Sequence, residues 1–542
     1  MKPSLTRTAL ASALVCGVCP SFAFQVDTGD SDLKLRIDTT VKYSAAGRVR
    51  ERRAELSNSP PTTVNQDDGD NNFNRGVVSN RLDLLSEADL EWQNFGARVS
   101  GAAWYDTIYN QSNDNATFTS NSRPANEFSS ETRKVMGRKG ELLDAFAYGR
   151  FDLGEGHSGI VRAGRHTLLW GESLFFGTNA IAGGQAPVDL VKLLSVPNSQ
   201  TKEISRPTGK VSGQIQLSDT ITVGGYVGYE WEKTRLQPAG AYLSTSDTMG
   251  PGAERVLAGP GATFERQPDL EPRRYGQGGV QLRWRADEVE TDFGFYAIRY
   301  HATTPSNIWT TLTGVPPAVQ PSSYRWAYHE GVRAFGVSAA KTVGIWSLAS
   351  EVSLRQNAPL SSLGQTVLST IGVNTSLDNR DNPGYAVGDT AHAQFSWLAS
   401  LGPSPLFQEA SFLGEVAWNR RLKVTANPQM LNPLADRDAT AVRMVLSPTY
   451  RQVFSGLDVS VPMGIGYGWG ASSAVGPGFA VDHGGDFNLG IQGTYLNNYF
   501  VGLTYVKYVG GMAPTLDAQN RAQFKQALRD RDFVSVSLRT TF

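Results

Sequence analysis

The chain has 542 residues, of which 50 are Lys or Arg and 51 are Asp or Glu, so its formal net charge is −1 at pH 7. This near balance excludes the strongly basic surface that nucleic-acid binding requires, and we expect no nucleic-acid partner. Glycine is abundant, with 56 residues, and aromatic residues make up 10% of the chain, a mixture that favours β-structure over helices.

The first 23 residues have the features of a secretory signal peptide. Lys2 and Arg7 form a positive start, residues 9–19 form a short apolar run, and Ala23 ends a small-residue cleavage site. The run is too short for a membrane-spanning helix. Both cysteines of the chain lie in this segment, so we expect a mature chain without disulfides.

Alternating strands begin soon after this segment and continue to the end of the chain. From Leu33 to Tyr43 nearly every second residue is apolar and the residues between are polar, which is the pattern of a strand with one face of each kind. The last eleven residues alternate in the same way and end on Phe542. A terminal phenylalanine in such a strand resembles the signal that the barrel-assembly machinery of Gram-negative bacteria recognises, so we expect that machinery as a partner.

The order of turns and loops indicates the fold. We predict about 18 strands (16–18), in which short turns alternate with long polar loops, as in transmembrane barrels with periplasmic turns and extracellular loops. A soluble β-sandwich, the alternative, has no reason to keep this order. The prediction is therefore an all-β fold: a single antiparallel transmembrane β-barrel over residues 24–542, closed by pairing of its first and last strands.

One connection departs from the polar character of the others, at the stretch RAGRHTLLWGESLFFG, residues 162–177. In strict alternation Arg165 would face lipid, at a cost of about 2–4 kcal/mol at mid-membrane. A β-bulge near Gly164 would turn Arg165 inward and move His166 to the lipid side, which is the interpretation we favour. The alternative is a position near the membrane interface, where the arginine side chain reaches water.

The residues after this strand are too apolar for an exposed loop, and two interpretations stay open. Either they cap the mouth of the barrel, or the segment folds into the lumen and forms an apolar constriction. In the second case we expect Glu172 to pair with an inward arginine. We also expect Trp170→Ala or Phe175→Ala to change solute transport more than barrel stability. The candidate constriction residues are Arg165, Trp170, Glu172, Phe175 and Phe176.

Charged residues of both signs fall on the predicted inward face. The candidate lumen charges are Arg36, Arg81, Glu87, Glu230, Glu351 and Arg355. A strongly ion-selective pore would be dominated by one sign. These residues either form salt bridges that brace the wall or create a transverse field that orients a dipolar solute, and both interpretations remain open.

Motifs of enzyme chemistry are absent from the sequence. The six histidines show no HExxH spacing, and Ser173 is not part of a GxSxG motif. We therefore expect no enzyme activity, no catalytic residues, no cofactor and no metal site. The acidic stretch at residues 67–72 is a weak candidate for Ca²⁺, but it lacks the glycine and the distal glutamate of an EF-hand, and a solvated loop is the preferred interpretation.

Several long segments resemble one known family. They are residues 162–183, 186–193, 229–256 and 346–360. These segments are similar to the domain-of-unknown-function 1302 family of proteobacterial outer-membrane proteins, whose members are often encoded beside an RND-type inner-membrane transporter and a LolB-like periplasmic protein. The resemblance implies an integral protein of the Gram-negative outer membrane that takes part in traffic of hydrophobic or amphipathic molecules. It supplies no catalytic residues.

Three functions are compatible with this barrel. The first is an outer-membrane channel or transport component for hydrophobic or amphipathic small molecules, lipid- or sterol-like, working with an RND-type transporter and a periplasmic carrier. The second is a general diffusion porin. The third is a non-conducting docking or structural barrel for an envelope lipid-trafficking system. In each case outer-membrane lipids and lipopolysaccharide are the expected surroundings, and the direction of transport stays open.

Overall fold

The computed structural model describes residues 24–26, 29, 32–154, 157–369 and 376–542. The predicted signal peptide and its cleavage site at Ala23 lie outside the described residues. Within the described residues, no helix is long and apolar enough to cross a bilayer.

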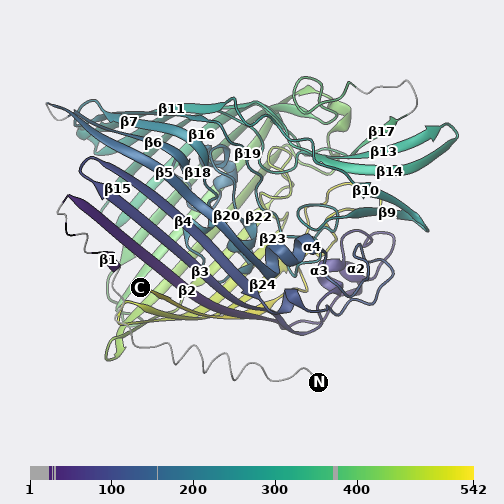
Figure 1. Cartoon of the computed structure of the whole chain (residues 1–542), viewed down its shortest axis with the longest axis horizontal. Helices are drawn as coiled ribbons and strands as arrows, with labels where there is room; N and C mark the ends of the chain where they lie inside the picture. Colours follow the sequence, from purple (N-terminus) through teal and green to yellow (C-terminus); the bar gives the residue numbers. More distant parts are fainter. Residues whose placement is uncertain (1–23, 27–28, 30–31, 155–156, 370–375) are drawn as a thin grey trace.

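Antiparallel strands form a closed barrel (Figure 1). The wall strands are β2 (Leu33–Arg48), β3 (Gly76–Trp92), β4 (Phe95–Asp106), β5 (Arg138–Gly154), β6 (His157–His166), β7 (Thr208–Gln216), β8 (Ile221–Gly228), β11 (Gln277–Ala286), β12 (Thr291–Tyr300), β15 (Val332–Val343), β16 (Trp346–Pro359), β18 (Val387–Leu401), β19 (Glu409–Ala426), β20 (Asp438–Phe454), β21 (Leu457–Ser460), β22 (Met463–Trp469), β23 (Gly484–Tyr495), β24 (Tyr499–Gly510) and β25 (Phe533–Thr541).

The wall has 18 positions, as predicted. The hydrogen-bonded sheet contains 20 strands, but β21 and β22 both pair with β20 and β23 and are two halves of one wall strand. The short strand β1 (Phe24–Val26) pairs with β2 just beyond the end of β25 and adds no position.

Pairing of β2 with β25 closes the ring, from Thr40 opposite Thr541 to Arg48 opposite Phe533. Phe542 extends this ladder, because its backbone N–H donates to the Thr39 carbonyl at 2.9 Å. Closure leaves no open sheet edge to lipid, as the bilayer requires. The predicted closed barrel is confirmed.

Long connections leave one end of the barrel, the loop end, and short turns join strands at the other, the turn end (Figure 1). The long loops carry short helical turns: α2 (Ala54–Ser57), α3 (Asp68–Asn71), η1 (Ile108–Asn110), α4 (Ser130–Thr132), η2 (Arg133–Gly137), η3 (Gly177–Asn179), η4 (Ile181–Gly184), α5 (Leu190–Ser195), α6 (Thr201–Ile204) and η6 (Pro428–Met430). The turn between β11 and β12 contains η5 (Asp287–Val289).

A second sheet of five strands projects from the loop end (Figure 1). Its strands, in spatial order, are β17 (Gln365–Ser369), β13 (Asn307–Val315), β14 (Ala318–Ala327), β10 (Ala262–Arg266) and β9 (Arg255–Gly259). These strands come from three different loops. The sequence predicts only long polar loops there.

The predicted bulge near Gly164 is wrong. β6 pairs with β5 and β7 without a register shift at this residue, so Arg165 keeps the outward phase. Arg165 lies one residue from the end of β6, where its guanidinium pairs with Glu230, and this position favours the interface alternative. His166 stays on the inward face, buried, with Nε2 2.7 Å from Ser212 Oγ.

Gly164 is required for another reason. Its φ is +130°, and a Cβ at this position would overlap the backbone of Ala145 and Phe146 on β5. Only glycine adopts this conformation without strain.

Candidate functional site

The connection between β6 and β7, residues 167–207, enters the barrel, and we call it the lumen loop. It contacts inward-facing side chains of β16, β18 and β19 on one side and of β2 and β3 on the other. In the strand order of the wall, β16 lies half the circumference away from β3. The loop therefore spans the lumen rather than only capping its mouth.

Trp170 fixes the first part of the lumen loop to the wall. Its indole lies 5.2 Å from the Tyr226 ring, edge to face, and 6.3 Å from the Tyr296 ring, and its backbone N–H donates to Gln185 Oε1 at 2.6 Å. The buried cluster around it comprises Trp170, Ile181, Tyr226, Tyr296, Ile298, Tyr300, Val332, Ala334 and Ala358. Trp170 is therefore packed against the inner wall and does not project into open space.

A buried carboxylate of β19 holds the next part of the loop. Glu415 accepts hydrogen bonds from Ser173 Oγ at 3.0 Å and from the backbone N–H groups of Leu174 at 3.1 Å and Phe176 at 3.0 Å. The N–H of Phe175 donates to Glu415 Oε2, the oxygen that also accepts from Leu174 and Phe176. Charge-assisted bonds of this kind are the strong ones, so a single wall glutamate orders four consecutive loop residues.

Glu351 of β16 acts in the same way. It accepts from the backbone N–H groups of Glu172 at 3.0 Å and Ile181 at 2.7 Å. Gly171 has φ +93°, and a Cβ there would overlap the Glu351 carboxylate, so the close approach requires glycine. The predicted pairing of Glu172 with an inward arginine is not a direct ion pair: no Arg or Lys of the described residues lies within 4 Å of its carboxylate, and the charge of Arg283 on β11 acts on it from farther away.

Further bonds on this side involve Arg355 of β16 and His392 of β18. Arg355 Nη2 donates to the carbonyls of Thr178 and Ala180, each at 2.9 Å. Asn179, between them, has Oδ1 3.0 Å from His392 Nδ1. We call the wall contacts of residues 170–181 the glutamate anchor.

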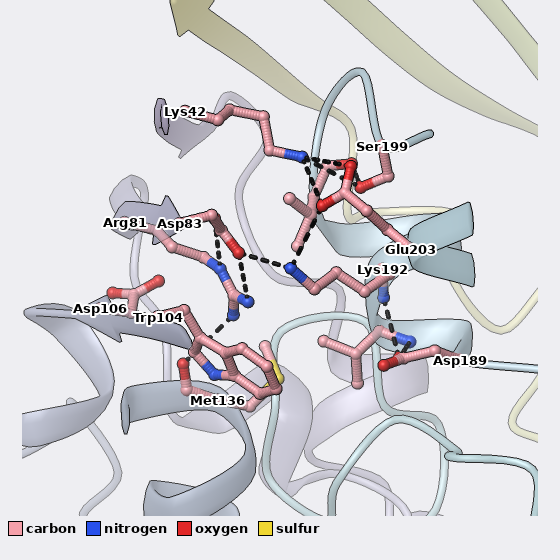
Figure 2. Close-up of polar contacts among 12 residues, drawn as sticks. Lys42, Arg81, Asp83, Trp104, Asp106, Met136, Asp189, Lys192, Ser199 and Glu203 are labelled. Carbon is pink, nitrogen blue, oxygen red and sulfur yellow. Dashed lines mark hydrogen bonds and ion pairs between the residues drawn. The ribbon is translucent and has the colours of Figure 1, made fainter. Parts of the chain in front are cut away.

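The other side of the lumen loop is held by ion pairs (Figure 2). Lys192 Nζ lies 2.5 Å from Asp83 Oδ1 on β3, and Asp83 also accepts two bonds from Arg81, at 2.8 Å each. Glu203 of the loop lies 3.4 Å from Lys42 Nζ on β2. These side chains are buried, and we call them the lysine anchor.

The lysine anchor depends on the short helix α5. The carboxylate of Asp189 accepts from the N–H groups of Val191 and Lys192, both at 3.0 Å, which is an N-cap. This cap starts the helix so that Val191 and Lys192 turn toward the wall and are buried. The next two residues, Leu193 and Leu194, are left half-exposed.

A sequence profile for a family described as "Protein of unknown function (DUF1302)" matches residues 4–542. The chain belongs to this family. The expected resemblance is thereby confirmed over nearly the whole length of this DUF1302 protein. A search among curated proteins found no match.

Similar solved structures include two from Acinetobacter baumannii and one from Pseudomonas aeruginosa. OccAB4 is 10% identical, with a TM-score of 0.43 over 94% of this chain and 97% of its own. OccAB3 is 8% identical, with a TM-score of 0.45 over 94% and 99%. OpdK, crystallised with vanillate, is 10% identical, with a TM-score of 0.41 over 94% and 98%.

The predicted lumen charges divide into three groups in this DUF1302 barrel. Those that contact the lumen loop, directly or through one neighbour, are Arg81, Glu87, Glu351 and Arg355. Arg36 lies near the turn end, largely exposed and 2.9 Å from Asp38. Glu230 is not a lumen charge: it follows the end of β8 and pairs with Arg165 at the rim.

The predicted constriction is also revised. Arg165 does not belong to it, since it lies on the outward face. Phe175 and Phe176 lie in the lumen loop, with Phe175 6.0 Å from the Arg443 guanidinium and Phe176 5.7 Å from Phe479. Sequence reasoning did not single out Lys192 or Glu203. The run DLVKLL at residues 189–194, an N-cap followed by apolar residues around one lysine, is the signal that could have found the first.

Proposed function

We propose that this DUF1302 protein is an outer-membrane channel for hydrophobic or amphipathic small molecules, lipid- or sterol-like in character, whose selectivity is set by the lumen loop. The observation that carries the proposal is a set of leucines on this loop. Leu169, Leu174, Leu193 and Leu194 are 45%, 46%, 49% and 47% exposed. Apolar surface in water costs about 25 cal/mol per Å², and a passing apolar solute would cover it.

Most charged side chains of the loop support the same proposal, because they are paired; within the part of the chain that the structure describes, the carboxylate of Glu172 is the exception. Lys192 and Glu203 are buried in ion pairs with the wall, and Lys202 pairs with Glu87. A general diffusion porin needs a wide lumen and a charge-lined constriction. A loop that has most of its charges bound to the wall and its leucines exposed fits an apolar passage better.

The non-conducting docking barrel remains a second candidate, favoured by one observation. The lumen loop is bound on both sides, to β16 and β19 and to β2 and β3, which would suit a permanent plug. For either candidate we propose an RND-type transporter and a LolB-like periplasmic carrier as partners. They would exchange an apolar cargo with the barrel at its turn end.

Uptake into proteoliposomes tests the channel. We expect a fluorescent fatty acid or sterol analogue to enter faster than a sugar of similar size. The double variant Leu193→Asn, Leu194→Asn should slow apolar uptake by about fivefold, which corresponds to about 1 kcal/mol of lost solute contact. Leu406→Asn is the matched control, since Leu406 is 77% exposed in the turn between β18 and β19, outside the lumen.

Planar-bilayer recordings separate the alternatives. Large, steady conductance that is insensitive to the apolar solute would point to a general porin. Neither conductance nor uptake in a heat-modifiable, folded barrel would point to the docking role. Because Trp170 is packed in a wall cluster, Trp170→Ala is expected to loosen the loop as well as change transport, so the exposed leucines are the cleaner probes.

A further inference from the structure

Three aspartates from two loops converge above the barrel mouth. Asp67 and Asp68 belong to the loop between β2 and β3, and Asp247 to the loop between β8 and β11. Each offers a carboxylate oxygen, and these oxygens all lie within 4.8 Å of one another. The three residues are only 1%, 2% and 0% exposed, so the predicted solvated loop at residues 67–72 is wrong.

The triad forms no ion pair, unlike a neighbouring aspartate, although the charges of Arg255 and Arg531 act on Asp68 and Asp247 from farther away. Asp70 is equally buried, but its carboxylate lies 2.7 Å from Arg48 Nη2 and 3.8 Å from Arg531 Nε. For Asp67, Asp68 and Asp247, no Lys, Arg or His nitrogen of the described residues lies within 4 Å. Buried carboxylates without a cationic partner carry a large desolvation cost.

Two oxygens of the triad also lack donors. Asp67 Oδ1 and Asp247 Oδ1 are buried and accept no hydrogen bond from the described residues. In contrast, both oxygens of Asp68 are satisfied, by Asn115 Nδ2 at 3.0 Å and the Asn121 N–H at 2.9 Å.

We propose that Asp67, Asp68 and Asp247 bind one Ca²⁺ ion that ties the two loops together. Ca²⁺ takes six to eight oxygen ligands in flexible geometry, whereas Mg²⁺ keeps several waters and uses one or two carboxylates. Three converging carboxylates, two of them with free oxygens, therefore suit Ca²⁺. Asn121 supplies another buried oxygen without a donor, Oδ1, on a residue already bonded to Asp68.

The backbone directly after Asp68 is in close contact with the loop that carries Asp247. A Cβ on Gly69 would lie 2.5 Å from the Ser244 carbonyl oxygen and 2.6 Å from that of Ala241. The two loops are thus in contact at the site before any ion enters, and the ion stabilises a preformed arrangement. Because Ca²⁺ would bind only when the two loops are assembled, it would stabilise their assembled form. Once the site is nearly saturated, this stabilisation grows with the logarithm of the Ca²⁺ concentration.

Calorimetric titration tests the proposal. The barrel should be refolded from inclusion bodies, which removes lipopolysaccharide and its bound cations, stripped with EDTA and titrated separately with Ca²⁺ and Mg²⁺. We expect one Ca²⁺ per chain and weaker binding of Mg²⁺. Asp247→Asn should weaken Ca²⁺ binding by about tenfold or more, because ligand charge sets affinity.

The controls separate loss of the site from loss of the fold. Asp381→Asn makes the same change on a side chain that is 78% exposed in another loop, and it should bind Ca²⁺ as the wild type does. Heat-modifiable migration reports folding, and Asp67→Asn replaces Asp247→Asn if that variant does not fold. Absence of Ca²⁺ binding, preference for Mg²⁺, or wild-type affinity in both triad variants would overturn the proposal.

Discussion

The two anchors of the lumen loop hold it to the wall by different chemistry. At the glutamate anchor the wall supplies charge, through Glu351 and Glu415, and the loop supplies mostly neutral backbone N–H groups. At the lysine anchor both partners are charged side chains, such as Lys192 and Asp83. Every residue except proline has an N–H group. Apart from Gly171, where a Cβ would overlap Glu351, the glutamate anchor should therefore tolerate changes in the loop sequence, whereas the lysine anchor should not.

Glu415→Gln should give the largest effect, since it leaves the buried donors of residues 173–176 without a carboxylate. We expect docking of this segment to weaken by about 3–5 kcal/mol, because each hydrogen bond to a charged group contributes about 1.5–3 kcal/mol and the glutamine amide keeps only some of these bonds. Chymotrypsin, which cuts after Phe175 and Phe176, measures the opening. Glu409→Gln, at an exposed position of the same strand, is the control, and protection unchanged in Glu415→Gln would remove the glutamate anchor from the account.

Lys192→Met should have an intermediate effect. Methionine keeps the length of the side chain near the Trp104 ring, and Asp83 retains Arg81, so the loss should be below about 3 kcal/mol. A double-mutant cycle with Asp83→Asn, read by tryptic cleavage after Lys202, a site that all four proteins keep, isolates the pair. Strictly additive effects would mean that the two side chains do not interact.

Ser173→Ala should have a small effect, because it removes one hydroxyl from Glu415 and leaves the neighbouring N–H groups in place. We expect about 1.5 kcal/mol, the low end for a hydrogen bond to a charged group. A loss as large as that of Glu415→Gln would show that the side chain, and not the backbone, holds the glutamate anchor. Chymotryptic protection measures this variant too.

Lys202→Ala should have the smallest effect. Its side chain is 40% exposed, and Glu87 keeps Arg98 as a second partner. Exposed ion pairs contribute about 0–1 kcal/mol. Raising the salt concentration should therefore mimic this variant while leaving the Lys192 pair largely intact. Equal salt sensitivity of both pairs would contradict the difference in burial.

The barrel itself could be predicted from the sequence because a strand's two faces repeat every second residue. That local rule located the wall strands and the inward phase of Glu351 and Arg355. The same rule correctly placed Arg165 on the outward face, and the predicted bulge, which would have turned it inward, was the error. The rule does not apply to loops, whose partners are distant in sequence, so the five-stranded sheet at the loop end was missed.

Each anchor has one part that could be predicted from the sequence and one part that could not. The inward position of Glu351 could be predicted from the alternation of its strand. The N–H groups that bind it could not, because every non-proline residue carries one and the sequence does not indicate which of them lie near Glu351. The N-cap before α5 is visible, yet the pairing of Lys192 with Asp83 depends on how the loop crosses the lumen. Burial of Asp67 likewise follows from contact with a distant loop, since the neighbouring Asp68 bonds Asp247 across 179 positions.

The most direct test of the central claim, that residues 167–207 cross the lumen, is a thiol cross-link between Ser173→Cys and Ser396→Cys. Ser173 Oγ bonds Glu415, which stands opposite Ser396 in the wall, and Ser396 Oγ bonds the Glu172 carbonyl at 3.3 Å. Residues 24–542 contain no cysteine, so the background is clean. We predict efficient linkage by a short bifunctional reagent in native outer membranes, with heat-modifiable folding retained. Free labelling of the Ser173→Cys thiol by a bulky maleimide from outside, without linkage, would contradict the account.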